Sequence, residues 1–271
     1  MLKIKGLSKR YEDGNLALDN LCLDIEQGQI FTLLGANGAG KSTTINIMCG
    51  FIPPSEGDVT IQDISLKENP LKLRSKIAYL SENVMLYDNF TGYQNLKFFY
   101  DISGKKTDRI VELRSTSEKH RSVELRSTSE KHRSVELRST LEQVLCDVGL
   151  QDEFIHKNIS KYSKGMRQKV GIAIALVKDT PLFLLDEPFS GLDPKAAYDF
   201  QMLLYKLRDE GKTIFMSTHD IFRAKEMADV VGIMKGGRLV MTKTRTELES
   251  ADLNMLYLDY IEEKENDGQI D

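Results

Sequence analysis

The sequence predicts an α/β fold in which a mostly parallel sheet lies beside a smaller antiparallel one. Residues 30–34 and 182–185 are almost entirely apolar, as is typical of parallel strands that are buried on both faces. The first run leads through a glycine-rich loop into residues 42–49, which have the pattern of a helix start. Shorter alternating segments predict the antiparallel strands, and they lie at residues 2–5, 21–25 and 59–61.

The glycine-rich loop has the pattern of a phosphate-binding loop. Residues 35–42 read Gly-Ala-Asn-Gly-Ala-Gly-Lys-Ser, and glycine lacks the Cβ atom that would keep backbone amides away from an anionic ligand. A helix N-terminus and Lys41 add positive potential where phosphates would lie, and Ser42 can ligate magnesium. A glycine-rich turn is the alternative, but the motif requires a strand before it and a helix after it, and both are predicted here. The residues expected to hold the triphosphate are Gly35, Ala36, Asn37, Gly38, Ala39, Gly40, Lys41, Ser42 and Thr43.

Beyond the predicted strand at residues 77–80, residues 91–177 are mostly helical in pattern and contain a perfect tandem repeat. A unit of 12 residues at 111–122 recurs at 123–134, and a partial third copy follows at 135–140. Excising residues 117–140 leaves one unbroken amphipathic helix. We therefore interpret these 24 residues as an in-frame expansion.

If one continuous helix ran through the insert, the apolar residues after the insert would not lie on the same side of the helix as the apolar residues before it. The reason is that 24 residues leave a remainder of about 240° after whole helical turns. We therefore predict at least one break, and each copy offers a Ser–Glu pair at capping-box spacing where a helix could restart. We favour a solvent-exposed expansion over the alternative, a docking surface for a partner. The three pairs are Ser115/Glu118, Ser127/Glu130 and Ser139/Glu142.

The second apolar run ends in two adjacent carboxylates, Asp186 and Glu187. They stand at the carboxyl end of a predicted parallel strand, which is the edge where open α/β sheets bind their ligands. One carboxylate can hold magnesium through its water shell while the next accepts a proton from an attacking water. The alternative is an acidic strand end before a turn at Pro188. Behind a phosphate-binding loop, the pair instead predicts triphosphate hydrolysis.

The last part of the chain contains two further strand signals and a hairpin. Residues 213–217 have the pattern of a short strand, and residues 230–234 and 239–241 flank a turn at 235–238. Residues 253–263 have the pattern of an amphipathic acidic helix. We place a C-terminal helix and tail at about residues 246–271.

Taken together, the order and spacing of these motifs resemble those of the ABC-transporter ATPases over nearly the whole chain. The resemblance implies a single domain over residues 1–271 with a P-loop NTPase core. The antiparallel strands would be an N-terminal subdomain, and residues 91–177 an inserted helical subdomain that contacts a membrane partner. The resemblance rests on four segments, which are Tyr162 to Gln168 before an apolar helix, Asp186-Glu187, Ser190 to Asp193 and Ser217 to His219.

The resemblance also assigns roles to single residues. Glu187 would be the general base, Asp186 the magnesium carboxylate, and His219 the switch that contacts the γ-phosphate of ATP. Asp193 would bridge two ATPase subunits. A histidine after a short strand is usually structural or exposed, so the role of His219 depends on its position in this series of motifs.

The segment that resembles the family's signature loop implies that two subunits share each ATP. Ser163 and Gly165 would contact the γ-phosphate of an ATP that is held by the opposite subunit. Lys164 replaces a glycine of the commonest family pattern, and Met166 replaces a glutamine. The Lys164 side chain either adds attraction for phosphate or points to solvent, and the sequence does not decide between these.

Two more positions are expected at the nucleotide. Tyr11 resembles the aromatic residue that stacks on adenine, and an ordinary edge-strand tyrosine is the alternative. Glu82 follows the strand at residues 77–80, where many family members carry a glutamine that touches magnesium. A carboxylate is a better ligand for a hard cation than an amide. It would, however, add negative charge beside Glu187 and the triphosphate.

Composition limits the partners. The chain has 271 residues, 41% of them apolar, and a net charge of -4, so it has no basic excess suited to nucleic acid. The three cysteines are far apart in sequence and suggest neither a disulfide framework nor a zinc site. No apolar run approaches the length of a membrane span. The resemblance to the ABC-transporter ATPases implies a peripheral protein at the cytoplasmic face of the membrane, with a separate membrane-spanning permease and a second copy or a related ATPase subunit as partners.

Two classes of function remain at this point. The first is a transport ATPase, most similar in its tail and signature variant to the ATPases of ABC-2-type exporters. The second is a nucleotide-gated switch that acts on DNA or ribosomes. Relatives of that class carry long coiled coils, zinc modules or two ATP sites, whereas this chain has one phosphate-binding loop and no sustained heptads. Co-purification of a membrane subunit that stimulates ATPase would favour the first class.

Overall fold

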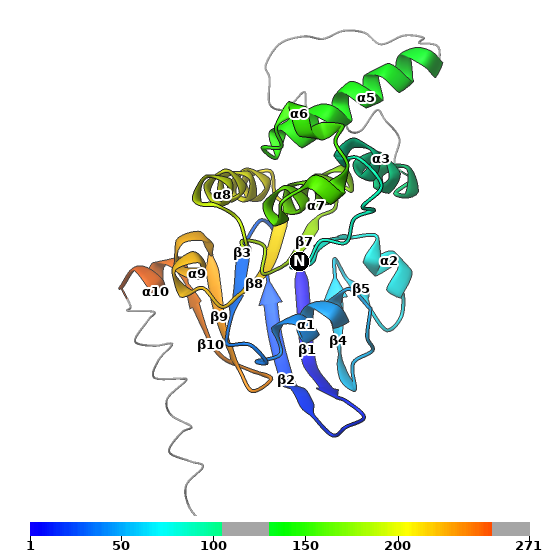
Figure 1. Ribbon diagram of the computed structural model, residues 1–271. Coiled ribbons are helices and arrows are strands. Elements are labelled where there is room, and N and C mark those ends of the chain that lie inside the picture. Colours follow the sequence, from blue (N-terminus) through cyan, green and yellow to red (C-terminus); the bar gives the residue numbers. More distant parts are fainter. Residues whose placement is uncertain (105–129, 251–271) are drawn as a thin grey trace, which may run out of the picture. The chain divides into compact units, whose positions relative to one another are not determined.

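The computed structural model describes residues 1–104 and 130–250 of the chain. They form two compact units, each with its own core, and helix α8 (Pro194–Asp209) runs from the second unit into the first. The first unit holds the sheets, and the second is helical (Figure 1). Within the described residues, the first unit comprises 1–82, 180–190 and 204–250, and the second comprises 83–104, 130–179 and 191–203.

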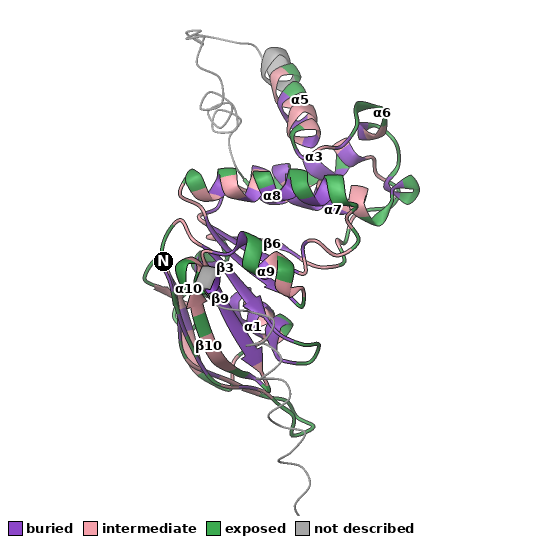
Figure 2. Ribbon diagram, turned by 90° about the vertical axis from the view of Figure 1, so that its left-hand side faces the viewer, coloured by how far each residue is buried: buried purple, intermediate pink, exposed green. Residues whose placement is uncertain are grey.

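A six-stranded, mostly parallel sheet forms the centre of the first unit. Its strand order is β10-β9-β3-β8-β7-β6, and only the β9–β10 hairpin at one edge is antiparallel. Every residue of β3, β7 and β8 is buried, which explains why most residues of β3 and β7 are apolar, whereas β8 also buries three hydroxyl residues. In Figure 2 the interior of this sheet is purple, whereas the edge strand β10 is mostly pink and green. The strands are β3 (Ile30–Leu34), β6 (Ile77–Leu80), β7 (Leu182–Asp186), β8 (Thr213–Thr218), β9 (Val230–Lys235) and β10 (Arg238–Thr244).

The predicted antiparallel sheet is present and has four strands in the order β2-β1-β4-β5. Its inward side chains, such as Leu2 and Ile4, share one core with Phe31 of the parallel sheet. The strands are longer than predicted because polar residues such as Lys9 and Arg10 continue the ladder at the exposed end. They are β1 (Leu2–Arg10), β2 (Leu16–Ile25), β4 (Glu56–Ile61) and β5 (Ile64–Ser65).

Short helices complete the first unit. Asn69 and Asp220 cap two of them, since their side chains accept hydrogen bonds from backbone N–H groups of the first turn. The helix after the glycine-rich loop lies against β7 and buries Ile45 and Met48. The helices are α1 (Lys41–Met48), α2 (Pro70–Arg74), α9 (Ile221–Met227) and α10 (Arg245–Ser250).

The second unit is built from helices, as the sequence predicts. A capping box at Thr91 and Gln94 starts α3, and the Ser163 hydroxyl caps α7. The core contains Leu96, Leu141 and Val170, which come from three different helices. The elements are α3 (Gly92–Ile102), α5 (Glu130–Asp147), α6 (Asp152–Ile155), a 3-10 turn (Ile159–Lys161), α7 (Lys164–Val177) and the first part of α8.

The third, partial copy of the repeat lies inside α5, which passes from Thr140 to Leu141 without interruption. Ser139 does not cap a new helix, because its hydroxyl donates back to the carbonyl of Glu136. A restart at Ser139/Glu142 is therefore wrong. Ser115/Glu118 and Ser127 lie outside the described residues, as does the helix expected at residues 253–263. In the described part of the chain, no helix is both long and apolar enough to span a bilayer.

Candidate active site

The glycine-rich loop connects β3 to α1 and is packed against the β9–β10 hairpin. A Cβ atom on Gly35 would lie 2.5 Å from the Met234 carbonyl oxygen. Gly40 has a φ of 108° and leaves no room beside the carbonyl of Ala17, 2.6 Å from an added Cβ. These two glycines are thus required by packing as well as by the approach of a ligand.

Lys41 lies within this loop and is only 6% exposed. Its Nζ donates to the carbonyls of Gly35 at 2.6 Å and Ala36 at 3.1 Å. The same ammonium is 3.7 Å from Glu187 Oε1. Burial lowers the pKa of Lys41, and the opposite charges of Glu187 and Asp186 oppose that shift. The loop therefore presents a partly desolvated positive charge beside the two carboxylates.

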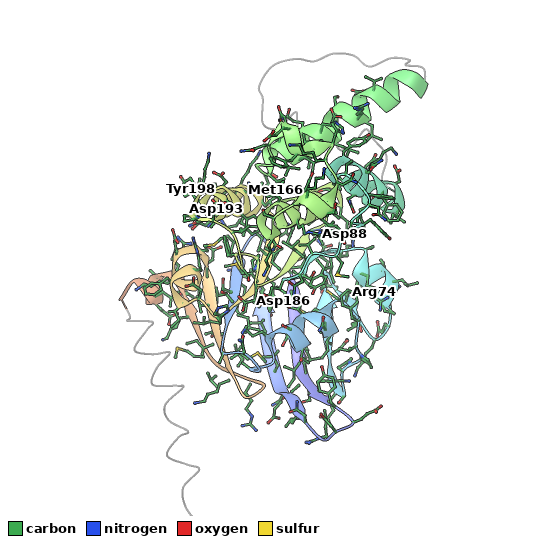
Figure 3. All side chains as sticks on the ribbon, viewed as in Figure 1. Arg74, Asp88, Met166, Asp186, Asp193 and Tyr198 are labelled. Atoms are coloured by element: carbon green, nitrogen blue, oxygen red, sulfur yellow. The ribbon has the colours of Figure 1, made fainter. Side chains whose placement is uncertain are left out.

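Asp186 ends β7 and meets two hydroxyl groups. Its Oδ1 accepts from Ser217 Oγ at 2.5 Å and from Ser42 Oγ at 3.3 Å. Asp186 is labelled in Figure 3 within the first unit. The hydroxyl of Ser42 and the carboxylate of Asp186 are hard oxygen donors of the kind that magnesium prefers. These two residues, which the sequence assigns to the metal, therefore lie together and suit it.

Glu187 has a left-handed backbone with a φ of 45° and a largely buried side chain. His219 Nδ1 is 3.0 Å from Glu187 Oε1. Even so, this buried oxygen accepts no well-aligned hydrogen bond from the described residues. His219 follows β8 and is itself mostly exposed. Glu187 Oε1 thus lies near Lys41 and His219 and still has lone pairs that accept no hydrogen bond from the described part of the chain. Such a carboxylate oxygen can take a proton from a water molecule.

Glu82 and Tyr11 each follow a strand and contact a hydroxyl group. Glu82 follows β6, which pairs with β7, and its Oε1 lies 3.3 Å from the hydroxyl of Ser190. Tyr11 follows β1, and its hydroxyl lies 3.5 Å from Thr43 Oγ1 at the start of α1. The structure thus brings Tyr11 to the helix that follows the phosphate-binding loop.

The signature residues lie in the second unit, where two turns meet. Ser163 Oγ accepts the Met166 N–H at 3.2 Å, and an added Cβ on Gly165 would be 3.6 Å from the Gly191 carbonyl. Lys164 Cδ lies 2.8 Å from where a Cβ of Gly191 would be. The stem of Lys164 is therefore packed along the turn at Gly191, a position that the sequence alone does not reveal.

Asp193 starts α8 in the second unit (Figure 3). Its Oδ1 accepts the Ala196 N–H at 2.9 Å, and this backbone hydrogen bond lowers the pKa of the Asp193 carboxyl. Asp193 is therefore an ionised helix cap in this chain, whatever further contact it makes.

Sequence reasoning missed Ser217. Ser217 belongs to one of the motifs, but the sequence assigned it no role. Its buried hydroxyl contacts both Asp186 and the backbone of Glu187. The signal that could have revealed it is strand register, since Asp186 on β7 pairs with Ser217 on β8. Register between distant strands is not visible in local sequence patterns.

Comparison with known proteins gives consistent results. The family model described as ABC transporter matches residues 18–190. The bacitracin transport ATP-binding protein BcrA of Enterococcus faecalis is 32% identical over 271 residues, which is 100% of this chain and 76% of BcrA. A fluoroquinolone export ATP-binding protein of Mycobacterium tuberculosis is 32% identical over 253 residues, which is 93% of this chain and 73% of that protein.

Solved structures agree in fold. An ATP-binding cassette, MJ0796, in a dimeric post-hydrolysis state with ADP and phosphate has a TM-score of 0.72 and 28% identity, covering 90% of this chain and 99% of that one. The structure of an ATP-binding subunit of an ABC transporter has a TM-score of 0.78 and 28% identity, covering 97% of this chain and 100% of that one. The predicted α/β architecture is thereby confirmed.

Proposed function

Because the chain belongs to the ABC transporter family of ATP-binding proteins, we propose that it uses ATP hydrolysis to drive a separate membrane-spanning subunit, and that this transporter is an exporter. Binding and hydrolysis of ATP are properties of the family. The observation that carries the proposal for this chain is the position of Glu187 Oε1, 3.7 Å from Lys41 Nζ and 3.0 Å from His219 Nδ1.

The hydrolytic step follows from this arrangement. Glu187 accepts a proton from a water molecule as the water oxygen attacks the γ-phosphorus. The bond between that phosphorus and the bridging oxygen breaks, and ADP leaves with its electron pair. Lys41 would offset the charge on the phosphate oxygens, and His219 would donate a hydrogen bond to the γ-phosphate.

Mg²⁺ would be held by Ser42 and by Asp186, the latter through its water shell, because their oxygens already face each other at 3.3 Å. The ion would supply positive charge that offsets the negative charge of the triphosphate. Glu82, which accepts from Ser190, would be a third oxygen donor near the ion. Tyr11 would stack on the adenine and Thr43 would lie beneath the phosphates.

We propose that two copies, or this chain and a related subunit, complete each other's sites. Ser163 and Gly165 would contact the γ-phosphate of the opposite subunit, and Asp193 would bridge the two. The similarity to MJ0796, which was solved as a dimer, supports this arrangement. Each ATP would then act as part of the dimer interface, so hydrolysis would release the two subunits.

The names of the two relatives support a role in transport, since one is a bacitracin transport protein, and the second name, a fluoroquinolone export protein, supports export as the direction. A permease at the membrane would place this chain at the cytoplasmic face. The switch on DNA or ribosomes has less support, because the net charge is -4 and nucleic acid attracts basic surfaces. No nucleic-acid partner is therefore proposed.

The test is Glu187→Gln. The amide keeps the shape of the side chain but cannot accept the proton, so turnover should fall by about 10²–10⁴-fold while ATP binding is retained. Size-exclusion chromatography with ATP and Mg²⁺ should show a stable dimer. Glu68→Gln, an exposed change in the same unit, is the control and should leave all three properties unchanged. Hydrolysis by Glu187→Gln at the wild-type rate would remove Glu187 from the mechanism.

A further inference from the structure

Ser217 is the next-to-last residue of β8 and is fully buried. It sits in the middle of the parallel sheet, paired with Leu33 on one side and Asp186 on the other. Its hydroxyl oxygen lies 2.5 Å from Asp186 Oδ1 and 3.1 Å from the backbone nitrogen of Glu187. One small side chain thus contacts both members of the carboxylate pair.

The chemistry of the groups fixes the direction of each hydrogen bond. The Glu187 N–H can only donate, so it must donate to a lone pair of Ser217 Oγ. The serine proton is then left to donate to the Asp186 carboxylate. Ser42 Oγ lies at 3.3 Å from the same Oδ1 and would turn toward Mg²⁺ when the ion is bound. Ser217 would then remain as the protein hydroxyl that holds Asp186.

The hydrogen bond from the Glu187 N–H to Ser217 Oγ stabilises the backbone conformation of Glu187. Glu187 has a φ of 45°, and residues with a side chain adopt this left-handed conformation only when their surroundings hold them there. The Ser217 hydroxyl anchors the amide at that residue. The same backbone conformation places the Glu187 carboxylate near Lys41 Nζ and His219 Nδ1.

We propose that Ser217 is a positioning residue for ATP hydrolysis, which orients Asp186 toward the magnesium site and fixes the backbone of Glu187. This inference rests on the proposed function. It explains why a polar residue occupies a fully buried place in a central strand, where an apolar one would be expected. A purely structural role, in which the hydroxyl only satisfies buried polar groups, makes different predictions.

The test compares Ser217→Ala with Thr213→Val. Thr213 lies at the other end of the same strand, is equally buried, and accepts the Gly28 N–H at 3.1 Å. Both variants remove one buried hydroxyl from β8, so both should lower the melting temperature. Only Ser217→Ala should lower kcat, by about 10–100-fold, as is common when a residue behind a metal ligand is removed.

A binding measurement separates positioning from stability. The ratio of the ATP Kd in EDTA to the ATP Kd with Mg²⁺ reports how much the ion adds to affinity. That ratio should shrink severalfold in Ser217→Ala and stay at the wild-type value in Thr213→Val. Ser217→Thr, which keeps the hydroxyl, should recover a large part of both kcat and the ratio even if its melting temperature is lowered.

The inference is overturned if folded Ser217→Ala keeps wild-type kcat and the wild-type Mg²⁺ effect, or if Ser217→Thr is as impaired as Ser217→Ala. Failure of the proposed function would look different. In that case the unmodified chain itself would show no Mg²⁺-dependent ATP hydrolysis, and no variant would be needed to see it.

Discussion

Glu82 stands where many ABC-transporter ATPases carry a glutamine. Its contact with Ser190 indicates whether glutamine can replace glutamate at this position. The Ser190 hydroxyl donates to Glu82 Oε1 at 3.3 Å, and the oxygen of an amide can accept the same bond. We expect Glu82→Gln to retain ATPase within about tenfold of the wild type, since a hydrogen bond to a charged acceptor exceeds a neutral one by about 1 kcal/mol.

Glu82→Ala is the matched comparison, because it removes the acceptor altogether and should reduce steady-state ATPase further. The assay should include a titration with Mg²⁺, in which Glu82→Gln reaches its full rate at a higher ion concentration. If Glu82→Gln proves as slow as Glu82→Ala, the negative charge is required and not only the oxygen.

Motif spacing was enough to name Lys41, Ser42, Asp186 and Glu187 as neighbours, and the structure brings them together. Their contacts are local consequences of two strand ends at one edge of a sheet. Ser217 and the packing of Lys164 on Gly191 could not be predicted in this way. Both depend on which residues face each other across distant segments, which a single sequence does not encode in its local pattern.

Among the secondary-structure elements, apolar strands were predicted best. The strands β3 and β6 begin and end where the sequence predicts, because buried runs bounded by loops have sharp limits. β1 was predicted too short, since its polar end is recruited by pairing with β2. α5 passes through Ser139 where a restart was possible, because the tertiary contacts of Leu141 and Leu145 override a local capping signal.

The repeat gives a prediction at the level of one helix. Since the copies are identical, removing residues 117–140 and removing residues 111–134 produce the same polypeptide. The shortened polypeptide therefore keeps the part of α5 that packs in the second unit. This part contains the buried residues Thr140 and Leu141 and the Arg138–Glu142 ion pair at 2.8 Å. We expect the shortened protein to melt within about 4 °C of the full chain, a shift equivalent to less than about 2 kcal/mol for a protein of this size.

Thermal unfolding and ATPase assays on the same preparation check this. Leu145→Ala is the destabilising comparison, because it empties a fully buried position in α5 and should cost about 2–5 kcal/mol. A deletion that lowers the melting temperature as much as Leu145→Ala, or abolishes ATPase, would show that the insert supports the fold or the site.

For the whole molecule, we proposed that Ser163 of one subunit completes the ATP site of the other. Mixing two variants of this chain tests whether two copies share their sites in this way. Ser163→Asp should preserve the fold, because aspartate caps a helix as well as serine does and the Ser163 hydroxyl caps α7. The added charge should repel the γ-phosphate of the opposite subunit. Lys41→Ala removes the positive charge of the phosphate-binding loop but leaves Ser163 intact.

Each variant alone should be nearly inactive, because every site in its dimers contains a defect. In an equal mixture, half of the dimers combine the two variants, and each of these has one intact site. ATPase should therefore recover to about a quarter of the wild-type rate if the sites act independently. Activity that stays at the sum of the two separate preparations would contradict the shared site.

The position of the third repeat copy has a consequence for inheritance. Thr140 and Arg138, which pack at the start of the buried part of α5, belong to the copy next to Leu141. Slippage during DNA replication adds or removes whole units, and any such event leaves an identical copy in that place. Genes of this lineage could therefore differ in length by multiples of 12 codons while encoding the same packed helix, so that natural selection on folding would not register the difference.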